Sequence, residues 1–193
     1  MNNKWAIIAA CALLPIFSGC SDAQGHSQKT ASTDPLPCAL QDITGKVAGE
    51  YTASGHLHSS YSLTNTSQRS CLIGKPVSFR SVGQNDDQSP ETVISSSNQK
   101  PDNLGQPGLA YPVTLAPGAS VYFEVYRASA INSNTLGLNC HVEQLTGLNI
   151  YINHSQAPIF VKNTHGNACL DSTHDIFSTS VLSHGNPLGN RAS

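Results

Sequence analysis

HSSYSLTN at His58–Asn65 and VYFEVYR at Val121–Arg127 are the two segments that decide the fold. Large apolar residues occupy every second position near the centre of each segment, and successive side chains of a β-strand point to opposite faces. Both segments are therefore predicted to be strands that bury one face in the core. The residues predicted to point inward are Tyr61, Leu63, Val121, Phe123 and Val125.

Six further segments have strand-like composition, and Gly, Pro and Asn residues separate them. No segment has convincing helical periodicity. About seven to eight short strands divided by turn residues predict an all-β protein with an immunoglobulin-like antiparallel β-sandwich. The six segments are Ile43–Ala48, Pro76–Val82, Tyr111–Leu115, Gly147–Asn153, Ile159–Lys162 and Ile176–Leu182.

The first 19 residues have the features of a bacterial lipoprotein signal peptide. Lys4 precedes an apolar run of 13 residues, Trp5–Phe17, and small residues lead to Cys20. A cationic start, a short apolar core and small residues before the cleavage site are typical of secretory signals. The run is shorter than the roughly 20 residues of a membrane-spanning helix. We predict cleavage after residue 19 and lipid attachment at Cys20. Because Phe17 replaces the usual Leu, cleavage without lipid is the alternative.

The rest of the chain is predicted to form a tether, one domain and a tail. Residues 20–37 and 184–193 are mostly polar, and such segments bury too little apolar surface to offset the entropy of ordering. We therefore expect a flexible tether at 20–37, a β-sandwich domain at 38–183 and a disordered tail at 184–193.

The charge of the chain excludes one class of partner. Charged residues make up 11% of the sequence, the formal net charge is -2, and no run of Lys or Arg occurs. Binding to a nucleic acid backbone requires clustered positive charge, so no nucleic acid partner is expected. The expected partners are a membrane, through the lipid on Cys20, and an envelope protein or a cell-wall polymer. No cofactor is expected.

Four cysteines of the predicted domain are expected to form disulfides: Cys38, Cys71, Cys140 and Cys169. They are well separated in an exported chain, and the C-x-x-C motif of zinc ribbons and redox proteins is absent from the sequence. Four cysteines allow three pairings. A hairpin that brings the start of one strand beside the end of the next favours Cys38 with Cys71 and Cys140 with Cys169. The other two pairings remain open.

Four sequence features occur in a recognisable order. They are Cys38, then LTNT at Leu63–Thr66 with CLIGKP at Cys71–Pro76, then VTLAPGAS at Val113–Ser120, and finally Cys140 with Cys169. In these features the chain resembles the bacterial domain of unknown function 4232 over about Cys38–Ser183. The resemblance implies an exported or lipid-anchored immunoglobulin-like sandwich and no established reaction.

His56 and His58 are the candidate metal ligands. Residues two apart on a strand point to the same face, so both imidazoles could bind one Zn or Cu ion. Such a site needs more ligands, and the spacing of the other histidines matches no known motif. These are His141, His154, His165, His174 and His184.

No catalytic residues are predicted. Gly118–Tyr122 lacks the final glycine of a nucleophile elbow, so Ser120 is interpreted as the start of a strand. Asp86 and Asp87 lie in a polar loop and are interpreted as solvated charges.

The sequence thus favours a non-enzymatic lipoprotein of the cell envelope whose sandwich presents loops to a binding partner. Two alternatives stay open. One is a periplasmic metal-binding protein that uses His56 and His58, and the other is an inhibitor that inserts the long polar loop Gly83–Gly108 into an envelope enzyme.

Overall fold

A computed structural model describes residues 34–94, 108–129, 140–171, 176–180, 182–186 and 188. The predicted signal peptide, Cys20 and most of the tether lie outside these residues. Within the described part, no helix is both long enough and apolar enough to cross a membrane.

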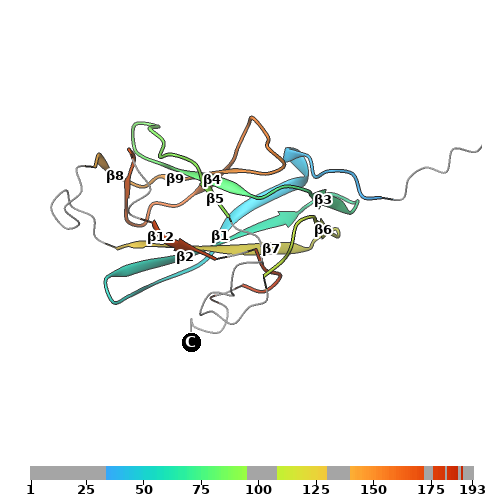
Figure 1. Ribbon diagram of the computed structural model, residues 1–193, viewed down its shortest axis with the longest axis horizontal. Helices are drawn as coiled ribbons and strands as arrows, with labels where there is room; N and C mark the ends of the chain where they lie inside the picture. Colours follow the sequence, from blue (N-terminus) through green and yellow to red (C-terminus); the bar gives the residue numbers. More distant parts are fainter. Residues whose placement is uncertain are drawn as a thin grey trace, which may run out of the picture. The chain divides into compact units, whose positions relative to one another are not determined.

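Two four-stranded antiparallel sheets form the body of the domain (Figure 1). The first has the order β1 (Ile43–Ala53), β2 (His56–Asn65), β7 (Ser120–Ala128) and β12 (Ile176–Thr179). The second has the order β10 (Ile159–Lys162), β9 (Gly147–Tyr151), β4 (Ser78–Val82) and β5 (Thr92–Val93). The all-β sandwich expected from the sequence is confirmed.

Two smaller antiparallel pairs and a short helix complete the described structure. β3 (Cys71–Ile73) pairs with β6 (Val113–Leu115), and β8 (Val142–Gln144) pairs with β11 (Asn167–Cys169). A 3₁₀ helix, Leu40–Asp42, precedes β1.

The core lies between the two large sheets. Phe123 of β7 stacks on Phe79 of β4, with ring centroids 6.0 Å apart, and on Tyr61 of β2 at 5.4 Å. All five residues predicted to point inward are fully buried. Burial of each large apolar side chain contributes roughly 1.5–3 kcal/mol. Gly147 is needed where β9 meets β10, because a Cβ there would collide with the Val161 carbonyl oxygen.

The outer face of the first sheet is covered in part by the chain that follows β12. Ser60 and Ser62 point away from the core, yet both are fully buried. Asn186 accepts a hydrogen bond from Ser60 Oγ at 3.0 Å, and Leu188 is 3% exposed. A tail was expected from residue 184 onward, but the structure places these described residues against β1 and β2.

All eight predicted strands are present, β10 with the predicted ends and the others with shifted ends. The described residues contain four more that were not predicted: β3, β5, β8 and β11. Each of the four has only two or three residues, too few to show a period. β5 falls within the polar segment Gly83–Gly108 and pairs with β4. Residues 95–107 of that segment lie outside the described residues.

β8 lies at one end of the sandwich, and β3 and β6 lie at the opposite end (Figure 1). Each end has one disulfide. Cys38 is bonded to Cys71 at the start of β3, with Cα atoms 4.7 Å apart. Cys140 is bonded to Cys169 of β11, with Cα atoms 5.5 Å apart. This is the pairing that the hairpin argument favours. We call these regions the β3–β6 end and the β8–β11 end.

Candidate functional site

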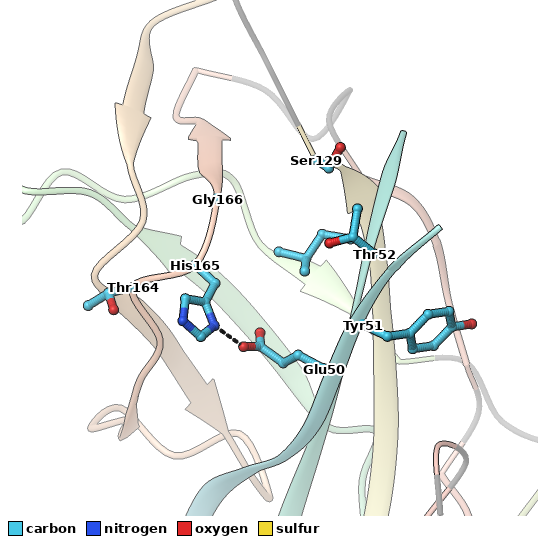
Figure 2. Close-up of a pocket in the computed structure, with 8 residues that line it drawn as sticks. Glu50, Tyr51, Thr52, Ser129, Thr164, His165 and Gly166 are labelled. Carbon is cyan, nitrogen blue, oxygen red and sulfur yellow. Dashed lines mark hydrogen bonds and ion pairs between the residues drawn. The ribbon is translucent and has the colours of Figure 1, made fainter. Parts of the chain in front are cut away.

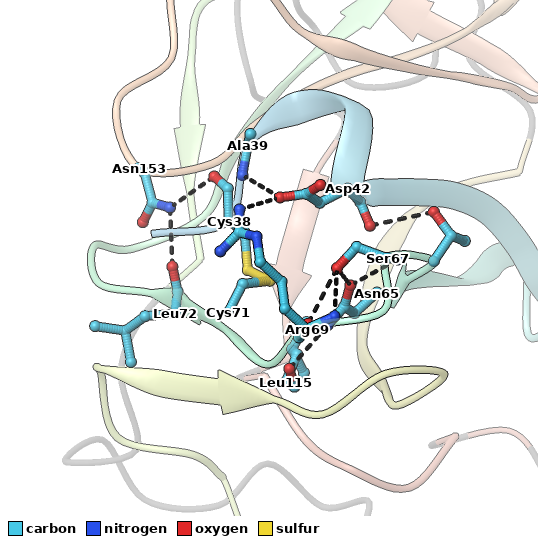
Figure 3. A network of polar contacts seen from close by, with 11 residues as sticks. Cys38, Ala39, Asp42, Asn65, Ser67, Arg69, Cys71, Leu72, Leu115 and Asn153 are labelled. Atoms are coloured by element: carbon cyan, nitrogen blue, oxygen red, sulfur yellow. Dashed lines mark hydrogen bonds and ion pairs between the residues drawn. A yellow bond between two sulfur atoms is a disulfide. The ribbon is translucent and has the colours of Figure 1, made fainter. Parts of the chain in front are cut away.

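Polar groups at the β3–β6 end bond almost entirely to one another (Figure 3). The buried Asn65 side chain donates to the carbonyl oxygens of Arg69 at 2.8 Å and Leu115 at 2.9 Å. Its Oδ1 accepts from the backbone N–H and the hydroxyl of Ser67. An Asn amide offers two donors and one acceptor oxygen, so Asn65 uses its full capacity and stabilises the turn after β2.

Two further contacts close this end. Arg69 Nη2 lies 2.5 Å from Asp42 Oδ2, whose oxygen also accepts from the Ala39 N–H. Asn153 Oδ1 accepts from the Gly74 N–H at 2.7 Å, and its Nδ2 donates to the Leu72 carbonyl at 3.0 Å. With these groups engaged, the β3–β6 end has a structural role.

His56 and His58 lie on one face of β2, as predicted, but they do not converge on a common point. Tyr126 of β7 contacts both rings, with centroids 4.7 Å from His56 and 4.4 Å from His58. His58 also stacks on Tyr51, and its Nδ1 lies 2.5 Å from Glu124 Oε1. The two histidines thus belong to a half-buried aromatic row.

A pocket of about 440 Å³ opens near the turn between β1 and β2 (Figure 2). Its lining includes one carboxylate, one imidazole and several hydroxyl groups. The lining residues are Glu50, Tyr51, Thr52, Leu57, Ser129, Thr164, His165 and Gly166. Pockets of 300–1,000 Å³ are typical of small-molecule sites.

Glu50 is the polar centre of this pocket. Its Oε1 accepts hydrogen bonds from Ser59 Oγ at 2.6 Å and from Asn163 Nδ2 at 2.8 Å, and its Oε2 contacts His165 Nδ1. A nucleophilic triad requires the imidazole to lie between the hydroxyl and the carboxylate. Here the carboxylate lies between Ser59 and His165, and Ser59 is fully buried. This geometry holds a pocket-lining imidazole in place but is not that of a nucleophilic triad.

Arg127 is buried directly behind the pocket. It lies opposite Leu57, which lines the pocket, and it is fully buried. Three of its nitrogens, Nε, Nη1 and Nη2, have no hydrogen-bond partner in the described part of the chain. Burial raises the pKa of nearby Tyr61, and the charges of Arg127 and Glu50 oppose each other there. The charge of Arg127 lowers the pKa of Tyr61, and the charge of Glu50 raises it.

A third group, at the β8–β11 end, contains Asp87, His141 and Glu143. One possible metal-ligand atom from each residue lies within 4.8 Å of the other two. Among the described residues, no other group of three His, Cys, Asp or Glu residues meets this criterion. His141 Nε2 is 3.2 Å from Glu143 Oε1. Asp171 Oδ1 accepts a hydrogen bond from the backbone N–H of His141, with 2.5 Å between the oxygen and the nitrogen. A pocket of about 270 Å³ opens beside the group, lined by Asp87, Gln88, His141, Leu170 and Asp171.

Neighbouring groups lower the pKa of Glu143. Glu143 is 9% exposed. Its carboxylate accepts hydrogen bonds from Asn85 Nδ2 at 3.0 Å and from the Asn85 N–H at 3.3 Å. The Asn85 side chain lowers the pKa of Glu143 against the opposing effect of burial, and the charge of His141 adds to this. Gly83 leaves room for the carboxylate, since a Cβ there would collide with it.

Residues 38–180 match the family described as Domain of unknown function (DUF4232). The chain belongs to the DUF4232 family. The match includes both disulfides and every residue of the three polar groups described above, so all of them lie within the DUF4232 domain. No curated protein and no solved structure matches the chain.

Sequence reasoning did not identify the His–carboxylate group of this DUF4232 domain. Asp87 was interpreted as a solvated charge, and His141 matched no motif. A signal was nevertheless present: His141 and Glu143 are two residues apart, the same spacing that singled out His56 and His58. His174 lies outside the described residues.

Proposed function

We propose that this protein is a lipid-anchored lipoprotein of the cell envelope whose sandwich is a non-catalytic binding module. The signal-peptide features before Cys20 and the two disulfides support an oxidising, extracytoplasmic location. Acyl chains on Cys20 are sufficient for stable anchoring when more than one is attached.

The observation that carries the binding role is the pocket around Glu50 and His165. Glu50 is saturated by Ser59, Asn163 and His165, so it positions the imidazole and is not available as a free base. His165 is 71% exposed and presents its other ring nitrogen outward. Thr52, Thr164 and Ser129 add hydroxyl groups that both donate and accept hydrogen bonds. These groups suit a hydroxyl-rich ligand, and we propose a saccharide segment of a cell-wall polymer.

The anchor is tested by fractionating cells that express the full-length protein or its Cys20→Ala variant. We expect the unsubstituted protein in the membrane fraction, with an acylated N-terminus by mass spectrometry, and the variant in the soluble fraction. Identical fractionation of the two proteins, or a mature N-terminus without acyl groups, would contradict the anchor.

The binding role is tested by calorimetric titration of the full-length protein, purified in detergent, with soluble cell-wall saccharide fragments. Loss of the hydrogen bond from the imidazole to the ligand in His165→Ala should weaken binding by about 10-fold. The matched control is His184→Ala, which removes an exposed histidine outside the pocket and should bind normally. Hydrolysis of the fragments, or equal affinity in both variants, would contradict the proposal.

A further inference from the structure

We propose that Asp87, His141 and Glu143 bind one divalent transition-metal ion, with Zn²⁺ preferred. This site is separate from the saccharide pocket, because the two share no lining residue. It also uses none of the candidate metal ligands named from the sequence, His56 and His58.

The spacing of the three side chains suits a single ion. Zn²⁺ binds His nitrogen and carboxylate oxygen at about 2.0–2.2 Å, so the ligands of a tetrahedral site lie roughly 3.4 Å apart. His141 Nε2 and Glu143 Oε1 are already 3.2 Å apart. Asp87 and His141 are exposed, and the three ligand atoms lie within 4.8 Å of one another. Small rotations of two solvent-facing side chains therefore complete the coordination.

The donor set also favours Zn²⁺ over a hard cation. Imidazole is a preferred ligand of Zn, Cu and Ni, whereas Mg²⁺ and Ca²⁺ prefer oxygen ligands alone. Two carboxylates add the negative charge that a dication neutralises. The 270 Å³ pocket beside His141 leaves a coordination position open to water or to a group from a partner.

The supporting contacts hold these ligands in place before any ion binds. Asn85 fixes both oxygens of Glu143, and Asp171 fixes the backbone of His141. Gln84 Nε2 donates to Gln144 Oε1 at 2.8 Å, which ties the Asp87 loop to β8. The Cys140–Cys169 disulfide joins β8 to β11 immediately before His141. Outer contacts of this kind orient metal ligands and tune affinity.

The test is a titration of the full-length protein with ZnCl₂ after removal of metal by a chelator. The protein is purified in detergent without a polyhistidine tag, and MgCl₂ is titrated in parallel. We expect one Zn²⁺ per chain and far weaker binding of Mg²⁺. His141→Ala, which removes an exposed ligand, should weaken Zn²⁺ binding by more than 10-fold. Asn85→Ala, which removes only a positioning contact, should weaken it by about 10-fold.

Two control variants assign the ion to this site. His184→Ala removes an exposed histidine elsewhere and should bind Zn²⁺ like the unsubstituted protein. A His56→Ala/His58→Ala double variant should do the same. The proposal is overturned if no Zn²⁺ binds, if His141→Ala binds normally, or if the double variant loses binding and His141→Ala retains it. Glu143→Gln is a second ligand variant, and circular dichroism shows whether it remains folded.

Discussion

Both ends of the sandwich contain a disulfide, but the polar residues around the two disulfides differ in how they are hydrogen-bonded. At the β3–β6 end, Asn65 makes every hydrogen bond that its amide allows, and Asp42 and Arg69 are paired. The β8–β11 end instead carries a His–carboxylate group and lies near the Glu50 pocket. Behind that pocket is Arg127, whose guanidinium has no hydrogen-bond partner among the described residues.

The difference indicates that the two ends have different roles. Satisfied polar networks specify one structure, whereas polar groups left open to solvent or without partners mark places where function is selected over stability. We infer that the β3–β6 end stabilises the domain and that the β8–β11 end, with the neighbouring pocket, binds ligands.

Removal of a disulfide should have the largest effect. The two bridges close loops of 33 and 29 residues, for which chain entropy predicts about 3–4 kcal/mol each. Any difference in the stability lost on removing each bridge therefore reflects packing in the native state. We expect Cys38→Ala/Cys71→Ala to lose about 1 kcal/mol more than Cys140→Ala/Cys169→Ala, because Cys38 and Cys71 are both buried in the network. Urea unfolding of the full-length proteins in detergent measures this, and equal losses would remove the distinction.

Asn65→Ala should lower the free energy of unfolding by about 2–3 kcal/mol. The substitution leaves the buried Leu115 carbonyl without the Asn65 donor and the Ser67 N–H without its acceptor, and an unsatisfied buried group costs about 1–3 kcal/mol. Asn149→Ala, at a half-buried position of β9, is the matched control and should change stability by less than about 0.5 kcal/mol. If the two variants have similar stability in urea, the structural role of the network is wrong.

Alkaline pH should weaken the domain through Tyr111. Burial raises the pKa of Tyr111 to about 12, although the Val77 N–H that donates to its hydroxyl opposes this. A group whose pKa is raised on folding stabilises the native state below its unfolded value, near 10, and that contribution is lost as the pH rises toward 12.

The loss between pH 10 and pH 12 should be about 2 kcal/mol. Tyr111→Phe should start less stable at pH 7, because the Val77 N–H loses its acceptor, but should fall less steeply above pH 10. Parallel slopes in urea unfolding at several pH values would contradict the assignment to Tyr111.

Arg127→Met should stabilise the protein by about 1–2 kcal/mol. A buried charge without hydrogen bonds costs more than an apolar side chain of similar volume. Arg127→Ala removes the same charge but leaves a cavity, so it should destabilise. Thermal unfolding of both variants separates the effect of removing the charge from the effect of leaving a cavity. A strongly destabilised Arg127→Met would show that the guanidinium has a partner essential for the fold.

The body of the fold was predictable because alternation is a local signal. The residues that β2 and β7 bury are the ones that alternation selects, and Tyr61 and Phe123 meet in the core as a result. The short β8 was not predictable, since three residues show no period. Its pairing with β11 depends on contacts between distant parts of the chain.

The candidate sites were less predictable for the same reason. The shared face of His56 and His58 follows from their spacing, but Tyr126 comes from another strand and its ring contacts both imidazoles. Asp87 reaches Glu143 only because the turn after β4 folds against β8, and no spacing motif records that contact. Asn186, which contacts Ser60, likewise belongs to a segment that its composition predicts to be a tail.

The most direct test of the division between the two ends is the Zn²⁺ affinity of two asparagine variants measured side by side. Asn65→Ala, at the β3–β6 end, should keep the affinity of the unsubstituted protein in spite of its lower stability. Asn85→Ala, at the β8–β11 end, should bind Zn²⁺ about 10-fold more weakly. Equal affinities in the two variants, or a larger loss in Asn65→Ala, would contradict the account.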